Sequence, residues 1–243
     1  MDYSFLQCGE GALTVHLGDG IDPAINRRVT ALQGAIGSAG LRGITDLIPA
    51  YADLTVCYDC TVISAKALQR QLRRLLDSLS VAGQDRRRVF RLPVCYGGDY
   101  GPDLDFVCHH SGLSAQEVIA LHSAPDYLIY MLGFLPGFAY LGGLDPRLHT
   151  PRLGSPRTCI PAGSVGIGGA QTGVYPLASP GGWQLLGRTP VSVFDWQRQE
   201  PILYRAGDLV HFVPISPAEY EEIARAVAAD TYTVQVEEVP VCD

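Results

Sequence analysis

The residues best suited to meet a small ligand lie between Arg157 and Arg188. The thirty residues that separate these two arginines carry no charge, and they include eight glycines and three prolines. Glycine at this density lets a ligand approach the backbone closely, and GSVGIGGAQTG offers backbone N–H groups of the kind that hold anions. The turns of a β-barrel also need glycine, so composition alone leaves both interpretations open.

Uncharged polar side chains in this region can orient an amide or a carboxylate without adding charge. They are Ser164, Gln171, Thr172 and Tyr175. Arg152 and Arg157 lie just upstream, and a guanidinium fork is the usual protein partner of a carboxylate or phosphate. Each of the two arginines could equally be an ordinary surface residue.

The glycine pattern does not match the common nucleotide-binding motifs. Lys66 is the only lysine of the chain, and no Gly-Lys-Ser/Thr occurs, so there is no P-loop. Gln171 stands at the third glycine position of the dinucleotide fingerprint. Because no Ser-His-Asp elbow, HExxH motif or cluster of carboxylates is visible, the sequence does not indicate a self-contained hydrolase.

His122 is the histidine that could act as a general acid or base. It ends the predicted helix SAQEVIALHS, just before a long uncharged stretch, and could face a cleft there. The alternative is a C-terminal helix cap that interacts with the helix dipole. His109 and His110, in CHHS, are expected at a helix end that faces solvent.

The uncharged stretch is YLIYMLGFLPGFAYLGGL, eighteen residues between Asp126 and Asp145. This length is at the lower edge of what a membrane-spanning helix needs. Pro136 and four glycines would break such a helix, and no other hydrophobic run exists to shield the freed backbone groups. We therefore expect a buried strand over residues 127–132 that runs into a Gly-Pro loop bordering a ligand cleft.

Composition excludes several classes of protein. With 47% hydrophobic and 18% charged residues, the chain can fill a core and is not typical of disorder. A net charge of −7 disfavours nucleic-acid binding. The N-terminus shows no signal peptide, and the seven cysteines suggest no disulfide framework, so we expect a cytoplasmic protein.

Two local features have alternative interpretations. CYDC at 57–60 has the spacing of a redox or zinc motif, but it lies in a strand-like pattern without a second ligand pair, so no metal site is expected. Eight of the eighteen basic residues fall between Lys66 and Arg91. They could form an anion or partner surface, or a solvated helix face followed by a basic linker.

Residues 1–86 are expected to form a ferredoxin-like α/β domain. A strand at GALTVHLG precedes a helix with Asp22 as N-cap and Gly40 near its end. Two strands, GITDLIPAY and ADLTVCYD, lead to a second helix, for which Ser64 is the expected cap. Its inward residues are Leu68, Leu72, Leu75 and Leu79. A further strand would complete the order strand–helix–strand–strand–helix–strand.

Residues 87–243 have the texture of a second domain, so the predicted fold class is α+β. Short apolar strands alternate with turns rich in Pro and Gly, which indicates a closed β-barrel or a sandwich. Asp103 and Ser114 are the expected caps of two short helices, and Glu117 completes a capping box. A final helix, SPAEYEEIARAVAA, precedes a strand at YTVQVEEV that could return to the first domain.

The long segment from YMLGFLPGFAYLGGL through CIPAGSVGIGGAQTGVYP to LLGRTP resembles the signature region of the family formed by the B subunits of 5-oxoprolinase. This family is also called the Kip inhibitor or allophanate hydrolase subunit 1 family. PVCYGGDYGPDLDFV and GLSAQEVIALHSAPDY are similar to its preceding segment. The resemblance covers nearly the whole chain, is strongest from 93 to 214, and implies that the second domain is a cyclophilin-like β-barrel.

The resemblance implies a heteromeric complex, in which a B-type chain such as this one is inactive alone. Its partners would be a related barrel protein, the C-type subunit, together with a separate A-type subunit. The complex would open 5-oxo-L-proline to L-glutamate with ATP as co-substrate and Mg²⁺, without a tightly bound cofactor. Phosphorylation of the lactam oxygen would give water an activated carbon to attack, and fixed N–H donors and cations would stabilise the developing negative charge. No contact with nucleic acid or a membrane is implied.

By position, the resemblance and the residue arguments together assign His122 and Gln171 as catalytic. The expected substrate-binding residues are Gly133, Pro136, Gly137, Phe138, Arg152, Arg157, Ser164, Thr172 and Tyr175. Two positions depart from the family pattern. Ala170 replaces a more polar residue, and Cys159 stands where a basic or small polar residue is usual, which weakens a phosphate-binding role for that strand.

Two other functions remain open at this point. Relatives on the same scaffold process urea or allophanate, and the sequence does not separate these substrates from 5-oxoproline. Other relatives inhibit a sensor histidine kinase. An inhibitor needs an exposed contact surface but no intact pocket, so the many cleft-type glycines and polar residues favour an enzyme.

Overall fold

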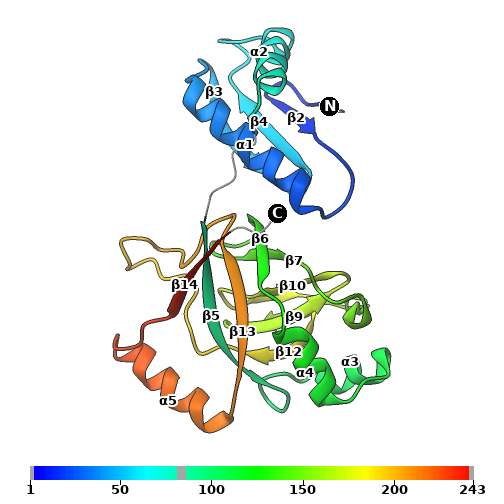
Figure 1. Ribbon diagram of the computed structural model, residues 1–243, viewed down its shortest axis with the longest axis vertical. Coiled ribbons are helices and arrows are strands. Elements are labelled where there is room, and N and C mark those ends of the chain that lie inside the picture. Colours follow the sequence, from blue (N-terminus) through cyan, green and yellow to red (C-terminus); the bar gives the residue numbers. More distant parts are fainter. Residues whose placement is uncertain (1–2, 81–85, 241–243) are drawn as a thin grey trace. The chain divides into compact units, whose positions relative to one another are not determined.

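The computed structural model describes residues 3–80 and 86–240 and divides the chain into two compact units, Met1–Gln84 and Asp85–Asp243 (Figure 1). Each unit has its own cluster of buried hydrophobic side chains. The domain boundary that the sequence predicts, after residue 86, stays a prediction, because residues 81–85 lie outside the described part.

The N-terminal unit is an antiparallel sheet covered on one face by two helices. Its elements are β1 (Ser4–Cys8), β2 (Ala12–His16), α1 (Pro23–Ala39), β3 (Ile44–Pro49), β4 (Asp53–Tyr58) and α2 (Ala65–Asp77). The four strands lie in the order β1-β2-β4-β3. Alternate residues of the two central strands, such as Leu13 and Val56, meet Leu32 and Leu72 of the helices in one core.

The predicted order of elements in this unit is wrong at one edge of the sheet. The sequence predicts a strand after the second helix, but the next described strand belongs to the other unit. Instead β1 forms the edge, as a hairpin with β2 that turns at Gly9, whose φ is 65°. β1 is almost entirely exposed, so it lacks the apolar alternation by which a strand is recognised in a sequence.

The helix ends of this unit agree with the sequence. The Asp22 carboxylate accepts a 2.6 Å hydrogen bond from the Ala24 amide, and Gly40 ends α1 in the left-handed conformation. Ser64 caps α2 by accepting from the Ala67 amide. The inward face of α2 differs slightly from the prediction. Leu68, Leu72 and Leu76 are buried, whereas Leu75 and Leu79 are only half-buried.

The C-terminal unit is built on a closed barrel of seven strands. They are β5 (Arg86–Tyr96), β6 (Tyr127–Leu132), β7 (Ala139–Gly142), β9 (Ser164–Gly168), β10 (Gln171–Val174), β12 (Gln184–Arg188) and β13 (Leu209–Ile215). They follow one another in the order β12-β9-β10-β7-β6-β13-β5, and a β12–β5 pairing closes the ring. The predicted α+β fold class is confirmed, and of the two predicted β architectures the barrel is the correct one.

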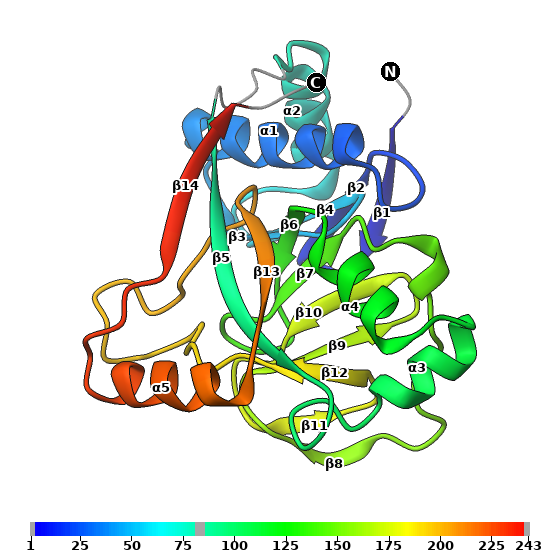
Figure 2. The ribbon, with the colours of Figure 1, turned by 60° about the horizontal axis from the view of Figure 1, so that its bottom comes forward.

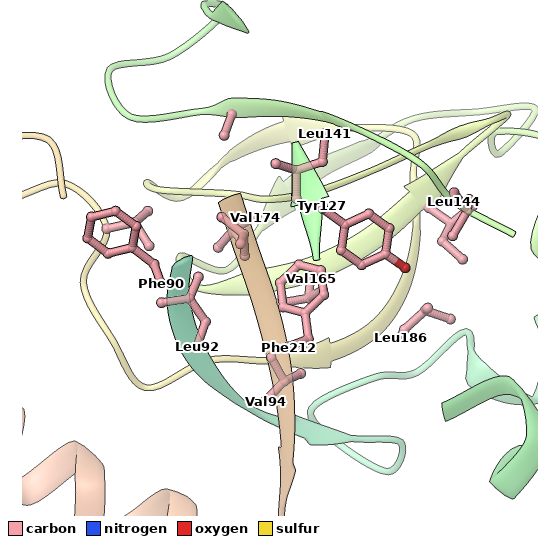
Figure 3. Close-up of a cluster of buried hydrophobic side chains, with 14 of the residues drawn as sticks. Phe90, Leu92, Val94, Tyr127, Leu141, Leu144, Val165, Val174, Leu186 and Phe212 are labelled. Atoms are coloured by element: carbon pink, nitrogen blue, oxygen red, sulfur yellow. The ribbon is translucent and has the colours of Figure 1, made fainter. Parts of the chain in front are cut away.

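The interior of the barrel is a packed hydrophobic core. Figure 3 shows side chains from β5, β6, β9 and β13 meeting there, among them Leu92, Tyr127, Val165 and Phe212. All four are fully buried. The barrel is therefore a scaffold without a central channel, and a ligand must be met elsewhere on the unit.

The last strand, β14 (Gln235–Pro240), extends the barrel sheet. The sequence suggested that it returns to the N-terminal unit, and this is wrong, because it pairs with residues 86–91 of β5 in the C-terminal unit. β5 is long enough to pair with β14 along its first half and with β12 at its end. A bidentate ion pair between Arg91 and Glu237, at 2.8 and 2.9 Å, crosses the β5–β14 ladder.

Three helices surround the barrel. Figure 2 shows α3 (Leu104–Ser111) and α4 (Ala115–Ser123) together on one side and α5 (Pro217–Ala228) apart from them. The capping box of Ser114 and Glu117 is confirmed. Asp103 is not the predicted side-chain cap of α3. Its carboxylate instead pairs with Arg157 at 2.6 Å and accepts from the Leu185 amide at 2.7 Å.

The uncharged stretch forms β6, a loop over residues 133–138, and β7, as a buried strand entering a Gly-Pro loop. A two-stranded sheet of β8 (Arg157–Ile160) and β11 (Ser179–Gly181) and the short helix η1 (Pro146–Leu148) complete the unit. Within residues 3–80 and 86–240, no helix has both the length and the apolar character to cross a membrane.

Closure of the barrel depends on a glycine at position 187. A Cβ there would lie 2.6 Å from the Cys95 carbonyl oxygen and 2.8 Å from the Val94 side chain. We expect Gly187→Ala to lower the free energy of unfolding of the C-terminal unit by about 2–4 kcal/mol, because the β5–β12 pair must separate. Urea denaturation followed by tryptophan fluorescence measures this, since both tryptophans lie in this unit. Gly154→Ala is the control, since a Cβ there meets nothing within 4 Å. Equal stabilities of the two variants would contradict the argument.

Candidate functional site

The outer wall of the barrel carries a second cluster of buried side chains, separate from the barrel core. Its members are Phe138, Ile160, Tyr175, Trp183 and Leu185. Strand alternation explains the separation. Along β9, β10 and β12, the side chains of Val165, Ile167, Thr172, Val174 and Leu186 point into the barrel, so the residues between them point outward. The outer cluster lies where β9, β10 and β12 meet the small β8–β11 sheet.

Glycines on the outer wall make room for the indole of Trp183. A Cβ at Gly173 would lie 3.2 Å from Cζ3 of this ring, and one at Gly168 would overlap its five-membered part. Glycine is therefore required at both positions so that the indole can lie against the wall. The sequence left two explanations for the glycines, ligand approach or barrel turns. Gly168 and Gly173 serve a third purpose, because they leave room for an aromatic side chain against the strands.

Phe138 is the centre of the aromatic cluster. Its ring centroid lies 5.1 Å from that of Tyr140, 5.4 Å from Tyr175 and 5.5 Å from Trp183, each in an edge-to-face arrangement. This geometry aligns the positive ring edges with the negative ring faces and stabilises each pair by about 0.5–1.5 kcal/mol. The cluster is consequently a rigid wall.

A cavity of about 280 Å³ opens against this wall. Its lining residues are Phe134, Phe138, Tyr140, Arg152, Pro156, Tyr175, Pro180, Gly181, Gly182 and Trp183. The volume is close to the lower end of the range for small-molecule sites, which starts at about 300 Å³. Three sequence-predicted residues, Phe138, Arg152 and Tyr175, come together here, and the lining is otherwise mostly apolar.

The sequence prediction missed Phe134, Tyr140 and Trp183. A signal was present for Trp183, since it is the only tryptophan in the thirty uncharged residues and follows two glycines. Tyr140 lies two residues after Phe138, so the period of a strand places both on one side of β7. Phe134 has a φ of 68°, which is unusual for a residue with a side chain, and its side chain is 63% exposed.

Arg152 is the cation of the cavity. Its guanidinium carbon lies 5.9 Å from the centroid of the Trp183 ring, within cation–π range. Across residues 3–80 and 86–240, Arg152 makes no ion pair and its side chain makes no hydrogen bond. The guanidinium edge is therefore available to an anionic ligand.

Arg157 is not available in the same way. It forms the ion pair with Asp103 and also donates to the Trp183 carbonyl at 3.4 Å. The carboxylate that this guanidinium binds belongs to the protein itself. The sequence treated Arg152 and Arg157 as equivalent candidates, and the structure separates them into an available cation and a positioning residue that fixes the segment before Trp183.

Tyr175 contributes a buried hydroxyl to the cavity. Burial raises the pKa of Tyr175, against the lowering effect of a hydrogen bond from the Trp183 backbone and of the nearby Arg152 and Arg157. The phenol consequently stays neutral at physiological pH and can serve as a hydrogen-bonding group, not as a base.

The loop over residues 133–138 positions the aromatic rings more than it lines the cavity. Backbone hydrogen bonds link Gly133 and Phe138 in a closed turn. Gly137 is buried with a φ of 82°, its carbonyl accepts a 3.0 Å bond from the Tyr204 hydroxyl, and a Cβ there would lie 3.0 Å from Cβ of Phe194. Pro136 is exposed. Of the four loop residues predicted to bind substrate, only Phe138 lines the cavity.

His122 lies inside the barrel and is fully buried. Its ring stacks on Phe212 with centroids 4.8 Å apart. Nδ1 lies 2.8 Å from the Tyr96 hydroxyl and Nε2 lies 2.8 Å from the Thr172 hydroxyl. Both sequence-based placements, a helix cap and a group facing a cleft, are wrong, since the side chain faces the core. The catalytic role stays a prediction.

The hydrogen bonds of this network fix the tautomer of His122. The Thr172 hydroxyl donates to the Gly166 carbonyl at 3.0 Å, so it accepts from Nε2–H of His122. Nδ1 then accepts from the Tyr96 hydroxyl. Burial lowers the pKa of His122 to about 3. The imidazole is thus neutral at physiological pH. Its hydrogen bonds connect α4 to Tyr96 on β5 and to Thr172 on β10, and Thr172 in turn bonds to Gly166 on β9.

The two remaining predicted residues, Ser164 and Gln171, do not line the cavity. The Ser164 hydroxyl is buried and donates to the Pro161 carbonyl at 2.7 Å, which is a structural contact. Gln171 is half-buried at the start of β10 and shares the outward direction of Gly173. It therefore lies on the face that carries Trp183, beside the cavity and outside its lining.

No group of three or more His, Cys, Asp or Glu side chains within the described residues is arranged to hold a metal ion. The cavity lining itself contains neither a carboxylate nor a histidine. What the site offers is one cation, aromatic surfaces, and hydroxyl and indole groups. Such a set can bind and orient a small anion with a planar body, but it has no group poised to remove a proton at neutral pH.

The comparisons with known proteins agree on one family. The family described as carboxyltransferase domain, subdomain C and D, matches residues 3–204. The chain is 42% identical over 228 residues to the B subunit of 5-oxoprolinase from Bacillus subtilis, covering 90% of this chain and 95% of that protein. It is 45% identical over 207 residues to the 5-oxoprolinase B subunit of Escherichia coli O157:H7, covering 85% and 93%.

Among solved structures, the urea amidolyase of K. lactis superimposes with a TM-score of 0.83 over 98% of this chain. The two sequences are 23% identical, and the chain corresponds to 16% of that much longer protein. At this level of identity the comparison shows a shared fold alone.

The buried imidazole should make stability depend on pH. The pKa of His122 is about 3 in the folded protein against an ordinary 6.5, so the unfolded chain binds more protons between these values. The stabilisation is complete above pH 6.5 and falls by up to about 1.4 kcal/mol per pH unit below it. His122→Phe keeps the ring but cannot be protonated. We expect it to be less stable at pH 7 by roughly 2–4 kcal/mol, with the gap narrowing toward pH 4.

Urea denaturation at pH 7, 5.5 and 4.5 measures the gap. His110→Gln, at an exposed position of α3, is the control and should keep the pH dependence of the parent. A gap between His122→Phe and the parent that is the same at all three pH values would contradict a neutral, buried His122.

Proposed function

Since the chain belongs to the family of 5-oxoprolinase B subunits, within the family described as carboxyltransferase domain, subdomain C and D, we propose that it is the B subunit of an ATP-dependent 5-oxoprolinase. The observation that carries this proposal is the similarity to a protein of that name over 95% of its length. The reaction would open the cyclic amide 5-oxo-L-proline to L-glutamate.

The chemistry explains why ATP would be needed. A lactam carbonyl is a weak electrophile, so transfer of the terminal phosphoryl group of ATP to its oxygen, with release of ADP, activates the carbon. Water then adds to this carbon, and the carbon–nitrogen bond of the ring breaks as the nitrogen takes up a proton, which leaves an acyl phosphate. A second water hydrolyses the acyl phosphate to L-glutamate and phosphate. Mg²⁺ would accompany ATP, as in other phosphoryl transfers.

The proposed complex divides the work between its chains. The cavity has a cation and aromatic walls but no carboxylate, histidine or metal-binding cluster among its lining residues. A phosphoryl transfer and an attack by water require a general base and Mg²⁺ ligands. We therefore assign substrate binding to this chain, and ATP binding and the proton transfers to the A-type and C-type partners.

Allophanate or urea is the second candidate substrate, because relatives on this scaffold include a urea amidolyase. Urea carries no charge, so Arg152 could donate to its carbonyl oxygen but could not form an ion pair with it. Allophanate has a carboxylate, as 5-oxoproline does, but lacks a ring to cover the aromatic wall. The available cation beside aromatic walls therefore favours 5-oxoproline.

The assembled enzyme gives the direct test. We expect 5-oxoproline-dependent release of ADP when this chain is mixed with its candidate A-type and C-type partners, and none from any of them alone. The readout is ADP formation by a coupled assay, with allophanate and urea as parallel substrates. Activity of the isolated chain would refute the division of work. ADP release with allophanate but not with 5-oxoproline would identify allophanate as the substrate.

Gln171 should matter for turnover through its place on the outer wall. Its amide is the uncharged polar group beside the cavity on β10, so it can orient a substrate amide. We expect Gln171→Ala to lower the turnover of the assembled complex roughly 100-fold, the scale of a positioned catalytic group. Gln197→Ala, at an exposed loop position, is the control and should leave turnover unchanged. Near-parental turnover of a folded Gln171→Ala protein would remove Gln171 from the site.

A further inference from the structure

We propose that the aromatic cavity of this chain is the site that binds the cyclic amide acid, with its carboxylate on Arg152 and its ring against Trp183. The identity of the ligand rests on the proposed function, whereas the site is derived from the cavity itself. The ligand class is a small cyclic amide that bears one carboxylate.

The first argument is the state of Arg152. The guanidinium carbon lies over the Trp183 ring, 5.9 Å from its centroid, and in the described part of the chain the group has no acidic partner. A guanidinium that stacks on an aromatic face keeps its N–H groups free at the edge, where a carboxylate can take two parallel hydrogen bonds. Arg152 is exposed, and it is the cation among the lining residues of the cavity, so a ligand carboxylate can reach it.

The second argument is the indole N–H of Trp183. The residue is only 4% exposed, yet among residues 3–80 and 86–240 its N–H has no hydrogen-bond acceptor. The indole nitrogen is not among the fully buried polar atoms that lack a partner, so this N–H reaches solvent and can donate to a ligand. Gly168 and Gly173 hold the ring in place without covering it by side chains. A ligand carbonyl is the group that would complete this site.

The third argument is that nothing in the lining repels an anion. The lining contains no Asp or Glu. The carboxylate of Asp103 is neutralised by the guanidinium of Arg157 and also accepts a hydrogen bond from the Leu185 amide. Apolar walls lower the local dielectric and strengthen the attraction of Arg152 for an anion.

A second pocket of the same unit lacks these properties. It has a volume of about 390 Å³ and lies beside Leu132, Phe194 and Tyr204. Its only two charged lining residues, Glu200 and Arg205, pair with each other at 2.8 Å. No cation is left for a carboxylate there, so the smaller cavity beside Arg152 is the better acceptor.

Tryptophan fluorescence can report on the site directly. The chain has two tryptophans, Trp183 in the cavity and Trp196, which is 75% exposed in a loop. Trp196→Phe therefore leaves Trp183 as the sole reporter. We expect a saturable change of its fluorescence on titration with 5-oxo-L-proline, measured on the full chain alone and again with its partner proteins.

The charge of the ligand and of the protein can be removed separately. In the Trp196→Phe background, Arg152→Gln should weaken binding of 5-oxo-L-proline by about 10- to 100-fold, the usual effect of a charge-assisted hydrogen bond. 2-Pyrrolidinone, the same ring without the carboxylate, should bind equally weakly to both proteins. Arg147→Gln is the matched control, because Arg147 is also exposed but pairs with Asp145. Circular dichroism checks that each variant is folded.

Two outcomes would overturn the site. One is an unchanged Trp183 signal in both the isolated chain and the complex. The other is a folded Arg152→Gln protein that binds 5-oxo-L-proline as tightly as its parent.

ADP release separates this inference from the proposed function. ADP release without a change in Trp183 fluorescence would support the proposed function and show that the substrate binds outside this cavity. Arg152-dependent binding without ADP release in any mixture would support the binding site and refute the proposed function.

Discussion

The outer face of the C-terminal barrel depends on the close contact between the Trp183 indole and a wall that has no side chains beneath it. Glycines at 168 and 173 let the ring lie flat on β9 and β10, and Phe138 and Tyr175 then close around it edge to face. A side chain at either glycine would lift the indole and open the aromatic cluster. The cavity exists because backbone and ring are in direct contact.

The same wall is held from its inner side by polar contacts. His122 bonds to Thr172, and Thr172 bonds to Gly166, so β9 and β10 are tied together from within the core. Thr172 and Gln171 are neighbours on one strand and point in opposite directions. His122 therefore positions, through Thr172, the strand that carries Gln171. The low pKa that burial gives it keeps this contact uncharged at neutral pH.

Two arginines close to the site illustrate how one residue type takes two roles. Arg157 directs its charge to Asp103 and thereby links β8 to the start of α3. Arg152 lies over the Trp183 ring and makes no ion pair within the described residues. A chain with this division has a rigid frame and a single charge for a ligand. The cavity lining contains no carboxylate or histidine, and the proposed division of work between this chain and its partners starts from this composition.

The sequence by itself determined the fold class, most helix ends, the buried strand of the uncharged stretch and the family, because local signals such as capping residues, alternation and long runs of motif carry them. It also named three lining residues, Phe138, Arg152 and Tyr175. Only the tertiary structure decided that β1 supplies the sheet edge, that β14 pairs with β5, that His122 is a core residue and that Arg157 is already paired. These depend on contacts between residues far apart in the chain, such as Asp103 with Arg157. No local pattern records which of two similar side chains finds a partner within the fold.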